Sequence, residues 1–383
     1  MLNRRSFIIA SGLTALASTR VFGANDTVRI GVIGAGRRMK QLLDAADKVA
    51  PYQIVAVSDV YGPNRDVVVQ RSNGLATAHL DYREVMAKDV DAVFIASPDH
   101  WHVRMAVDAL AAGKDVYLEK PVTHTLEESA TLTSAVRSSK QILQCGMQQR
   151  SWMHFRDAVD LVQAGSLGRV VQVRTYWWQN YQRHWPAKPV DPQALDWKLW
   201  LGSAPDQPFS EEKFNYWRWY WNFGGGAMTD LFTHWIDVVH WAMKTDQPRQ
   251  AHVLADKYIF EQWDCPDTLQ AAFRYSGFDV VYEGMMNSSI DDGGIEFRGM
   301  EATLKIDRGG FAVYREGVPK EQNPVLTEHS FRDGTISHME NFFECIKTRK
   351  EPNAPVETGV AAARAGHIGN LAYHSGQTWQ AKV

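Results

Sequence analysis

The sequence predicts an α/β protein with two domains: an N-terminal Rossmann domain with a doubly wound parallel sheet, and a C-terminal α/β domain with a largely antiparallel open sheet. Three observations support this prediction. From Val28 to Gln144, short apolar runs alternate with helical segments, which is typical of a parallel sheet covered on both faces. The first run leads into the glycine turn Gly34-Ala35-Gly36. After residue 150, alternating runs are joined by turns that contain glycine, as in antiparallel sheets.

Residues 1–24 resemble a twin-arginine export signal and are set apart from the fold. Arg4-Arg5 precedes an apolar stretch from Ser6 to Ala17, too short for a bilayer, which needs roughly 20 residues. A membrane-anchoring N-terminus is the alternative. A signal of this kind predicts export of the folded protein to the periplasm or beyond, with the twin-arginine export machinery as a partner. Because no free nicotinamide pool is expected there, a nicotinamide cofactor would have to stay bound and be regenerated on the enzyme, or the reaction would have to be redox-neutral.

The composition is that of an ordinary globular protein. With 383 residues, the chain exceeds the usual size of one hydrophobic core, which favours two domains. A net charge of −3 gives no support for a nucleic-acid partner, and no stretch after residue 24 is apolar enough for a membrane-spanning helix. The odd number of cysteines, without metal-binding spacing, predicts three small buried hydrophobic side chains: Cys145, Cys265 and Cys345.

The first predicted domain covers residues 25–150 and consists of strands that alternate with helices. Apolar runs predict its strands at Val28–Ile33, Ile54–Ser58, Ala92–Ala96, Val116–Leu118 and Ile142–Gln144. Helical patterns lie at Lys40–Val49, Asn64–Ser72, Tyr82–Lys88, Val103–Ala112 and Leu126–Ser138. Right-handed crossovers would then give a Rossmann-type fold.

The second predicted domain, residues 151–383, serves substrate binding and oligomerisation and ends in helices. A loop region rich in proline and tryptophan separates its first strand from the rest. Predicted helices lie at Phe155–Ala164, Thr229–Ala242, His338–Thr348 and Val360–Ser375. Predicted strands lie at Arg169–Trp178, Gln250–Phe260, Leu269–Tyr275, Val280–Asn287, Gly294–Arg298, Ala302–Ile306 and Phe311–Tyr314. An exposed face of such a sheet favours a homo-oligomer.

Tryptophan is unusually frequent, and ten of the 14 tryptophans lie between Trp177 and Trp241. A tryptophan-rich core explains many of them. The functional interpretation is a carbohydrate cleft, where flat aromatic faces pack on sugar rings.

The turn after the first strand approximates a dinucleotide fingerprint. Gly34 and Gly36 permit a tight turn and a close approach of pyrophosphate to a helix N-terminus, whereas Met39 replaces the third glycine and affects helix packing. Asp59 ends the second strand, where a carboxylate accepts hydrogen bonds from ribose hydroxyls and favours NAD over NADP. The neighbouring Arg37 and Arg38 could instead pair with a phosphate.

Further candidate residues follow later strands of the first domain, at the sheet edge where ligands of such folds bind. Lys120, held between a strand end and a proline, could hydrogen-bond to or exchange protons with a substrate hydroxyl. The segment Ser97-Pro98-Asp99-His100-Trp101-His102 follows the predicted strand Ala92–Ala96, and its side chains could line the adenosine or nicotinamide ribose pocket. Helix capping by Ser97 and Asp99 is the alternative for this segment. The residues assigned to cofactor binding at this edge are Ser97, Pro98, His102, Glu119, Lys120 and Gln148.

A triple-glycine turn, Gly224-Gly225-Gly226, opens a predicted helix on which Asp230 and His234 are four residues apart on one face. Oxidation of an alcohol needs a base for the hydroxyl proton, and histidine suits neutral pH. Asp230 could orient His234 or bind a sugar hydroxyl. The pair could alternatively bind a metal, although no third ligand is evident, or form a plain buried hydrogen bond.

Together these motifs resemble the family of glucose–fructose oxidoreductase and inositol dehydrogenase, the Gfo/Idh/MocA family. The resemblance rests on Gly34-x-Gly36, Glu119-Lys120-Pro121 and Asp230-x3-His234, with support from His338-x2-Asn341-Phe342 and the helix from Val360. It implies a Rossmann domain followed by an α/β domain, a sugar or cyclitol substrate, a catalytic Lys120, and a catalytic pair of Asp230 and His234.

The sequence therefore predicts an exported oxidoreductase that acts on a carbohydrate with tightly bound, internally recycled NAD. Lys120 and His234 would handle the hydroxyl proton, and the expected lining residues of the substrate pocket are Arg150, Trp177, Arg218 and His338. The first alternative is a glycosidase that recycles NAD through oxidation, elimination, hydration and reduction of a glycoside. The second alternative is a non-catalytic sugar-binding protein.

Overall fold

The computed structural model describes residues 27–290 and 292–381. The predicted twin-arginine signal lies outside these residues. In the described part of the chain, no helix combines the length and apolarity needed to cross a membrane. The three cysteines are buried and unpaired, as their sequence context predicted.

The first part of the chain forms a parallel sheet of six strands with the order β3-β2-β1-β4-β5-β6. Its strands are β1 (Val28–Ile33), β2 (Tyr52–Ser58), β3 (Thr77–His79), β4 (Ala92–Ile95), β5 (Asp115–Leu118) and β6 (Leu143–Cys145). The connecting helices are α1 (Arg37–Ala46), α2 (Gly62–Arg71), α3 (Tyr82–Met86), α4 (Asp99–Ala111) and α5 (Glu128–Ser138). The predicted doubly wound fold is confirmed. The chain reverses direction across the sheet between β1 and β4, where such folds bind ligands.

The second part contains a sheet of nine strands with the order β14-β13-β12-β11-β7-β10-β9-β8-β15. β7 pairs in parallel with β10, and the other neighbouring strands pair antiparallel, so the largely antiparallel sheet is confirmed. The strands are β7 (Val170–Trp178), β8 (Gln250–Asp256), β9 (Thr268–Arg274), β10 (Asp279–Met285), β11 (Gly293–Gly299), β12 (Ala302–Ile306), β13 (Gly310–Arg315), β14 (Leu326–His329) and β15 (Trp379–Gln380).

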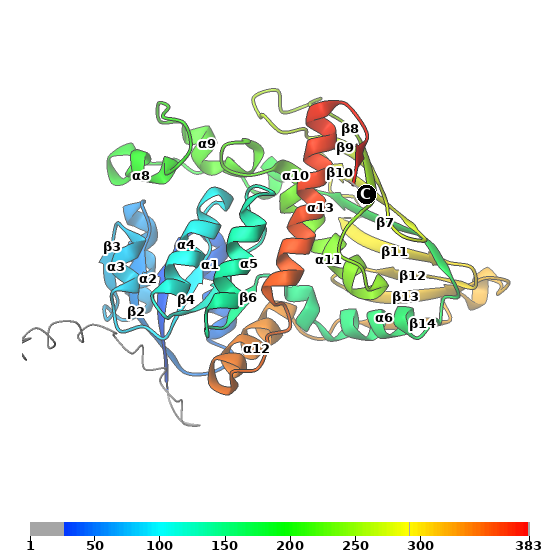
Figure 1. The fold of residues 1–383 in the computed structure, drawn as a ribbon, viewed down its shortest axis with the longest axis horizontal. Coiled ribbons are helices and arrows are strands. Elements are labelled where there is room, and N and C mark those ends of the chain that lie inside the picture. Colours follow the sequence, from blue (N-terminus) through cyan, green and yellow to red (C-terminus); the bar gives the residue numbers. More distant parts are fainter. Residues whose placement is uncertain (1–26, 291, 382–383) are drawn as a thin grey trace, which may run out of the picture.

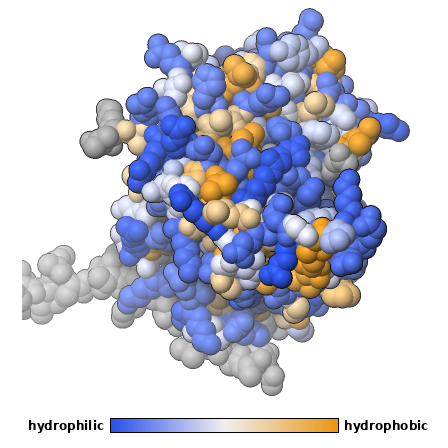
Figure 2. All heavy atoms as spheres, turned by 90° about the vertical axis from the view of Figure 1, so that its right-hand side faces the viewer, coloured by the Kyte–Doolittle hydropathy of each residue, from blue (hydrophilic) through white to orange (hydrophobic). Residues whose placement is uncertain are grey.

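Helices cover one face of this second sheet, and the other face is open. The covering helices are α6 (Met153–Gln163), α10 (Gly226–Asp230), α11 (Phe232–Met243) and α13 (Val356–Ser375) (Figure 1). Figure 2, which views the molecule from the sheet side, shows mostly hydrophilic residues with small hydrophobic patches between them. On the sheet, Glu296 pairs with Arg298 at 2.6 Å and with Arg174 at 3.3 Å. Subunit pairing through this face remains a prediction.

Helix α12 (Gly334–Thr348) belongs to the core of the first sheet although it comes near the end of the chain. Its Phe342 contacts Phe94 of β4, with ring centroids 5.8 Å apart, and Met339 is fully buried in the same cluster. The predicted boundary at residue 150 therefore separates the two sheets. The hydrophobic core of the first sheet, however, includes residues from both sides of this boundary.

The segment between β7 and α10, residues 179–225, crosses over the carboxyl ends of the parallel strands, and we call it the strap (Figure 1). Leu195 forms a bridge with Tyr61, and the main-chain N–H of Asp196 donates to the Val60 carbonyl at 3.0 Å. Trp101 of α4 donates to the Trp200 carbonyl at 3.0 Å. The strap contains α7 (Tyr181–His184), η2 (Pro192–Ala194), α8 (Trp197–Leu201), α9 (Glu211–Asn215) and η3 (Trp217–Trp219).

Candidate functional site

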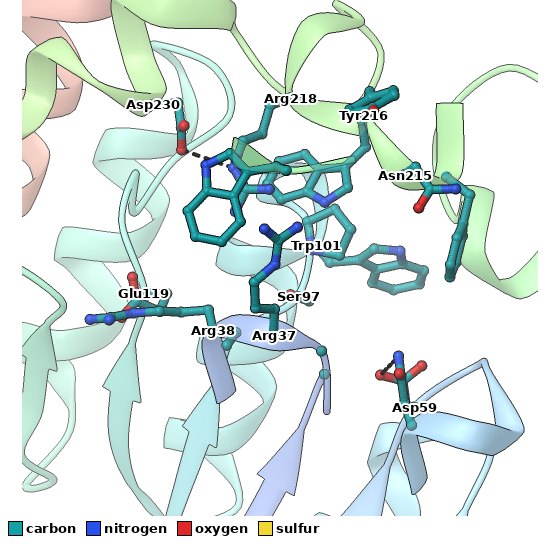
Figure 3. A pocket seen from close by; sticks show the side chains of 18 of the residues that line it. Arg37, Arg38, Asp59, Ser97, Trp101, Glu119, Asn215, Tyr216, Arg218 and Asp230 are labelled. Atoms are coloured by element: carbon teal, nitrogen blue, oxygen red, sulfur yellow. Dashed lines mark hydrogen bonds and ion pairs between the residues drawn. The ribbon is translucent and has the colours of Figure 1, made fainter. Parts of the chain in front are cut away.

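A cavity of about 490 Å³ lies between the carboxyl ends of the parallel strands on one side and the strap with α10 and α11 on the other (Figure 3). Its size is within the range of small-molecule and cofactor sites, roughly 300 to 1,000 Å³. Four buried polar atoms of lining residues have no hydrogen-bond partner in the described structure: Arg38 Nη2, Ser97 Oγ, Gln148 Oε1 and His234 Nδ1. Buried polar atoms are normally paired, so these four are free to bind a ligand.

The glycine turn opens the cavity floor to a phosphate. Gly34 has a φ of +77°, and a Cβ atom there would lie 2.7 Å from the main-chain nitrogen of Ser97, so only glycine fits. Gly36 is the N-cap residue of α1, and no atom lies within 4 Å of the position that a Cβ atom would take there. The first N–H groups of α1 are thus available to an anion. Met39 is fully buried in the core, where it packs under the turn.

Asp59, directly after β2, lies at the other end of the cavity from α10 (Figure 3). Its carboxylate accepts hydrogen bonds from the main-chain N–H groups of Ala35, at 2.7 Å, and Tyr61, at 2.8 Å. Burial raises the pKa of Asp59, and these hydrogen bonds oppose the increase. The bond to Ala35 joins the carboxylate to the glycine turn, which is the arrangement expected for a ribose-binding acid.

Neither of the two adjacent arginines lies against Asp59 (Figure 3). Arg38 turns away and donates to Glu119 at 2.7 Å. Arg37 extends across the cavity, and its guanidinium carbon lies 3.9 Å from the ring centroid of Trp185 in the strap. The side-chain positions therefore favour a free ribose hydroxyl at Asp59 over a 2′-phosphate.

Lys120, Arg218 and Asp230 form one charged cluster at the end of the cavity next to the second sheet. Lys120 Nζ lies 2.6 Å from Asp230 Oδ1 and 2.8 Å from the Asp230 carbonyl oxygen, and Arg218 Nε lies 3.1 Å from Oδ1. Burial alone would raise the pKa of Asp230, but the charges of Lys120 and Arg218 outweigh it and lower the pKa. Asp230 is therefore a stable carboxylate that fixes the ammonium group of Lys120.

His234 lies beside this cluster as a neutral imidazole. Burial, and then the positive charge of Lys120, holds its pKa well below the usual range. The ring stacks on Trp177, with centroids 5.4 Å apart. Because Nδ1 has no hydrogen-bond partner in the described structure, the ring can exchange a hydrogen bond or a proton with a ligand.

The structure corrects the predicted relation between Asp230 and His234. Asp230 is the last residue of α10 and His234 lies in the first turn of α11, with Leu231 as a break between the two helices. They do not share one helix face, and Asp230 bonds to Lys120 and Arg218 rather than orienting His234. Among the described residues, no group of three or more His, Cys, Asp or Glu side chains could hold a metal ion.

Most of the predicted site residues line this one cavity, but three do not. His102 bridges the Pro121 and Ser97 carbonyl oxygens at 2.6 and 2.9 Å, and so joins two loops beneath the site. Arg150 pairs with Asp237 at 2.8 Å. The predicted residues that do line the cavity are Gly34, Gly36, Arg37, Arg38, Asp59, Ser97, Pro98, Glu119, Lys120, Gln148, Trp177, Arg218, Asp230 and His234.

His338, the third exception, is fully buried outside the cavity. Its two ring nitrogens contact Ser151 Oγ at 2.7 Å and the Cys145 carbonyl oxygen at 2.8 Å. Both nitrogens are thus occupied by the protein. This position makes His338 a structural residue of the junction between β6 and α12, in contrast to the substrate contact expected from the sequence.

Several lining residues were not assigned individually to the site from the sequence. Most come from the strap or lie beneath it, where irregular backbone gives no periodic pattern. Their tryptophan-rich context was the one available signal, whereas nothing in the sequence distinguishes Arg308. These residues include Trp101, Gln179, Tyr181, Trp185, Tyr216, Trp217 and Arg308.

Two models of one protein family match successive parts of the chain. A model of the Gfo/Idh/MocA oxidoreductase family with an NAD-binding Rossmann fold matches residues 28–147, and a model of the Gfo/Idh/MocA C-terminal domain matches residues 155–305. An uncharacterized oxidoreductase of Bacillus subtilis, YrbE, is 33% identical over 139 residues, which are 36% of this chain and 40% of that protein. The 1,5-anhydro-D-fructose reductase of Ensifer adhaerens is 22% identical over 88% of this chain and 94% of its own length.

A solved structure of levoglucosan dehydrogenase in complex with NADH and L-sorbose has a similar fold. The TM-score is 0.75 at 18% sequence identity, over 93% of this chain and 99% of that chain. At this level of identity, the similarity concerns the fold alone.

Proposed function

Because the chain belongs to the Gfo/Idh/MocA family of NAD-binding oxidoreductases, we propose that it oxidises a hydroxyl group, or reduces the corresponding carbonyl group, of a carbohydrate. The first domain is an NAD-binding Rossmann domain. The observation that carries the proposal is the convergence of Lys120, Asp230 and His234 on one end of the cavity, opposite the ribose-binding Asp59.

The residues of the cavity fit NAD along its length. Asp59 suits a ribose, and the glycine turn with the start of α1 suits the pyrophosphate. When bound, NAD accepts or returns a hydride at C4 of its nicotinamide ring. Pro98 and Gln148 also line the cavity, and they would contact the nicotinamide.

Lys120 and His234 would exchange the proton of the substrate hydroxyl. Asp230 holds Lys120 Nζ from two oxygens, so the third ammonium hydrogen can point to a substrate oxygen. His234, as a neutral ring with an unpaired Nδ1, can accept the proton that leaves this oxygen. Trp177, which stacks on His234, would pack against the apolar face of the sugar ring.

We also propose that the nucleotide stays bound between turnovers, a property supported by the strap. Lining residues of the strap and its anchors surround the cavity near Asp59 as well as near Asp230. With the twin-arginine motif Arg4-Arg5, this enclosure favours a protein that is exported folded with its cofactor. An enzyme of this kind regenerates NAD in place, by a second sugar or within a glycosidase cycle.

The test uses the purified protein with its bound nucleotide and no added nicotinamide. We expect an accepted sugar to reduce the bound NAD, seen as new absorbance at 340 nm. Lys120→Met should lower the rate at least about 100-fold, as expected for loss of a proton-transfer group, with NAD content unchanged. Lys48→Met, on the exposed surface after α1, is the matched control.

Aryl glycosides separate the oxidoreductase from the glycosidase. Release of many aglycone molecules per protein would assign the NAD-recycling glycosidase, whereas a single round of cofactor reduction assigns the oxidoreductase. A protein that neither contains nor takes up NAD would contradict both.

A further inference from the structure

Among the described residues, Arg308 is one of three cations that line the cavity without an ion pair to a carboxylate, together with Arg37 and Lys188. Arg308 lies in the tight turn between β12 and β13, and its guanidinium carbon is 4.9 Å from the ring centroid of Trp177 and 5.9 Å from that of Trp235. In the described part of the chain, Arg308 forms no hydrogen bond or ion pair, although it lines the cavity. Trp177 also stacks on His234, so Arg308 belongs to the substrate end of the site.

Arg308 remains charged at neutral pH in spite of its surroundings. Its side chain is exposed, and the surrounding protein displaces enough water to lower its pKa to about 10. The charge of Arg38 lowers this pKa further, while Asp333 and Asp292 oppose the decrease. Because the side chain is exposed, water solvates its charge, and an anionic ligand that displaces this water would become the partner of Arg308.

The neighbouring carboxylates do not pair with Arg308. Asp333 and Asp292 raise its pKa but form no ion pair with it in the described structure. The single carboxylate of Asp230 already pairs with two cations, Lys120 and Arg218. The carboxylate of Glu119 is paired with Arg38. Asp99 is also close to Asp230, but its burial, and then the charge of Asp230, raise the pKa of Asp99 well above its usual range. The substrate end of the cavity therefore keeps an excess of positive charge.

We propose that the substrate is an anionic sugar and that Arg308 binds its carboxylate or phosphate group. This inference rests on the proposed function and adds the substrate class. An aromatic ring against the face of a guanidinium leaves the N–H groups in its plane free, and these N–H groups match the paired oxygens of a carboxylate or phosphate. The anion would neutralise Arg308, while His234 and Lys120 act on a hydroxyl of the same sugar ring.

The first experiment measures binding to the NAD-loaded protein by calorimetry. Each series compares a neutral hexose with its uronic acid and its 6-phosphate: galactose, galacturonate and galactose 6-phosphate, and the same three for glucose and mannose. We expect an anionic member of at least one series to bind at least about tenfold more tightly than its neutral parent. The member that binds identifies the group as a carboxylate or a phosphate. If no series shows this preference, the inference is wrong.

The second experiment uses variants of the arginine. Arg308→Met should lower the ratio of kcat/KM for the anionic sugar to that for its neutral parent by about 10- to 100-fold, and Arg308→Lys should lower it less. Arg315→Met, at the other end of β13 and outside the cavity, is the matched control, with NAD content and the melting temperature as checks of folding. An equal loss for both sugars in Arg308→Met would give Arg308 a structural role and overturn the inference.

These outcomes are distinct from a failure of the proposed function. If anionic sugars bind tightly through Arg308 but never reduce the bound NAD, the inference stands and the oxidoreductase does not. If neutral sugars reduce NAD as well as anionic sugars do, the oxidoreductase stands and the inference does not.

Discussion

Three buried histidines show how hydrogen-bond partners separate structural from chemical roles. The ring nitrogens of His102 and His338 both contact protein oxygens, whereas Nδ1 of His234 has no partner in the described structure. All three pKa values are lowered by burial. Only His234 faces the cavity. A free nitrogen at a cavity wall, more than burial or a shifted pKa, marks the residue available for chemistry.

His338 should make the stability of the protein depend on pH. Burial lowers its pKa to about 4 in the folded state, while an unfolded histidine titrates near about 6.5. Between these values the unfolded state binds more protons, so the contribution of neutral His338 to stability is lost as the pH falls. From pH 7 to pH 5 the loss is about 2 kcal/mol.

Denaturant unfolding at pH 7 and pH 5 checks this prediction. His338→Gln should be less stable than the parent protein at pH 7, and the difference should shrink by about 2 kcal/mol at pH 5. A difference for His338→Gln that is equal at both pH values would contradict the prediction.

The sequence identified the site residues whose position follows from the path of the backbone. It did not show which side chains point into the cavity and which point away from it. Asp59 and Lys120 follow parallel strands, so the fold itself places them at the binding edge. Arg150 follows the last parallel strand, but its side chain pairs with Asp237 outside the cavity. His338 comes from α12, and its ring is held by Ser151 and the Cys145 carbonyl. Arg308 could not be identified from the sequence, because the sequence of a turn between two strands does not show which cavity its side chains line.

Among the secondary-structure elements, the strap has the largest influence on the site. It has short helices and no regular periodicity, so the sequence indicated only a loop rich in proline and tryptophan. Its position is set by aromatic packing, such as Trp197 on Trp200 at 4.6 Å, and by its main-chain bonds to the first domain. The short strands β3, β14 and β15 were missed for a related reason, since two to four residues at a sheet edge carry little pattern.

Gly202→Ala should release bound NAD faster. Gly202 ends α8 of the strap with a φ of +58°, and a Cβ atom there would lie 2.4 Å from the Trp101 ring. The added methyl group pushes the strap away from α4. Because opening of the strap relieves this strain, about 1 to 3 kcal/mol of it corresponds to a dissociation rate increased about 5- to 150-fold. Stopped-flow measurement of NAD release checks this.

The matched control is Gly277→Ala in the turn between β9 and β10. Gly277 also has a positive φ, of +92°, but no atom lies within 4 Å of the added Cβ. It therefore reproduces the backbone strain without touching the strap. Equal release rates from the two variants would show that the strap does not control retention.

At the scale of the whole molecule, the two sheets were predictable and the division of the core was not. Alternating strands and helices identified the Rossmann sheet, and two-residue alternation identified the second sheet. The sequence pattern of α12 shows an apolar helix face but not the partner of that face. Phe342 and Met339 complete the core of a sheet whose last strand ends nearly 200 residues earlier.

A fragment of residues 25–150 should therefore fail to fold cooperatively. Without α12, the aromatic rings of Phe94 and Tyr117 lose their contacts with Phe342 and stay exposed to water. Thermal unfolding followed by circular dichroism should show a broad transition for the fragment and a sharp one for the full chain. Joining residues 334–348 to the fragment through a flexible linker should restore the sharp transition. A cooperative transition of the fragment alone would contradict this role of α12.

Arg218 belongs to the strap, yet it holds the carboxylate of Asp230. The strap also continues directly into α10, which carries that carboxylate. In the proposed function, a movement of the strap that releases the dinucleotide would therefore also shift Arg218 and α10, and with them the carboxylate that holds Lys120. Loss of the nucleotide and loss of the proposed acid–base groups would then occur together.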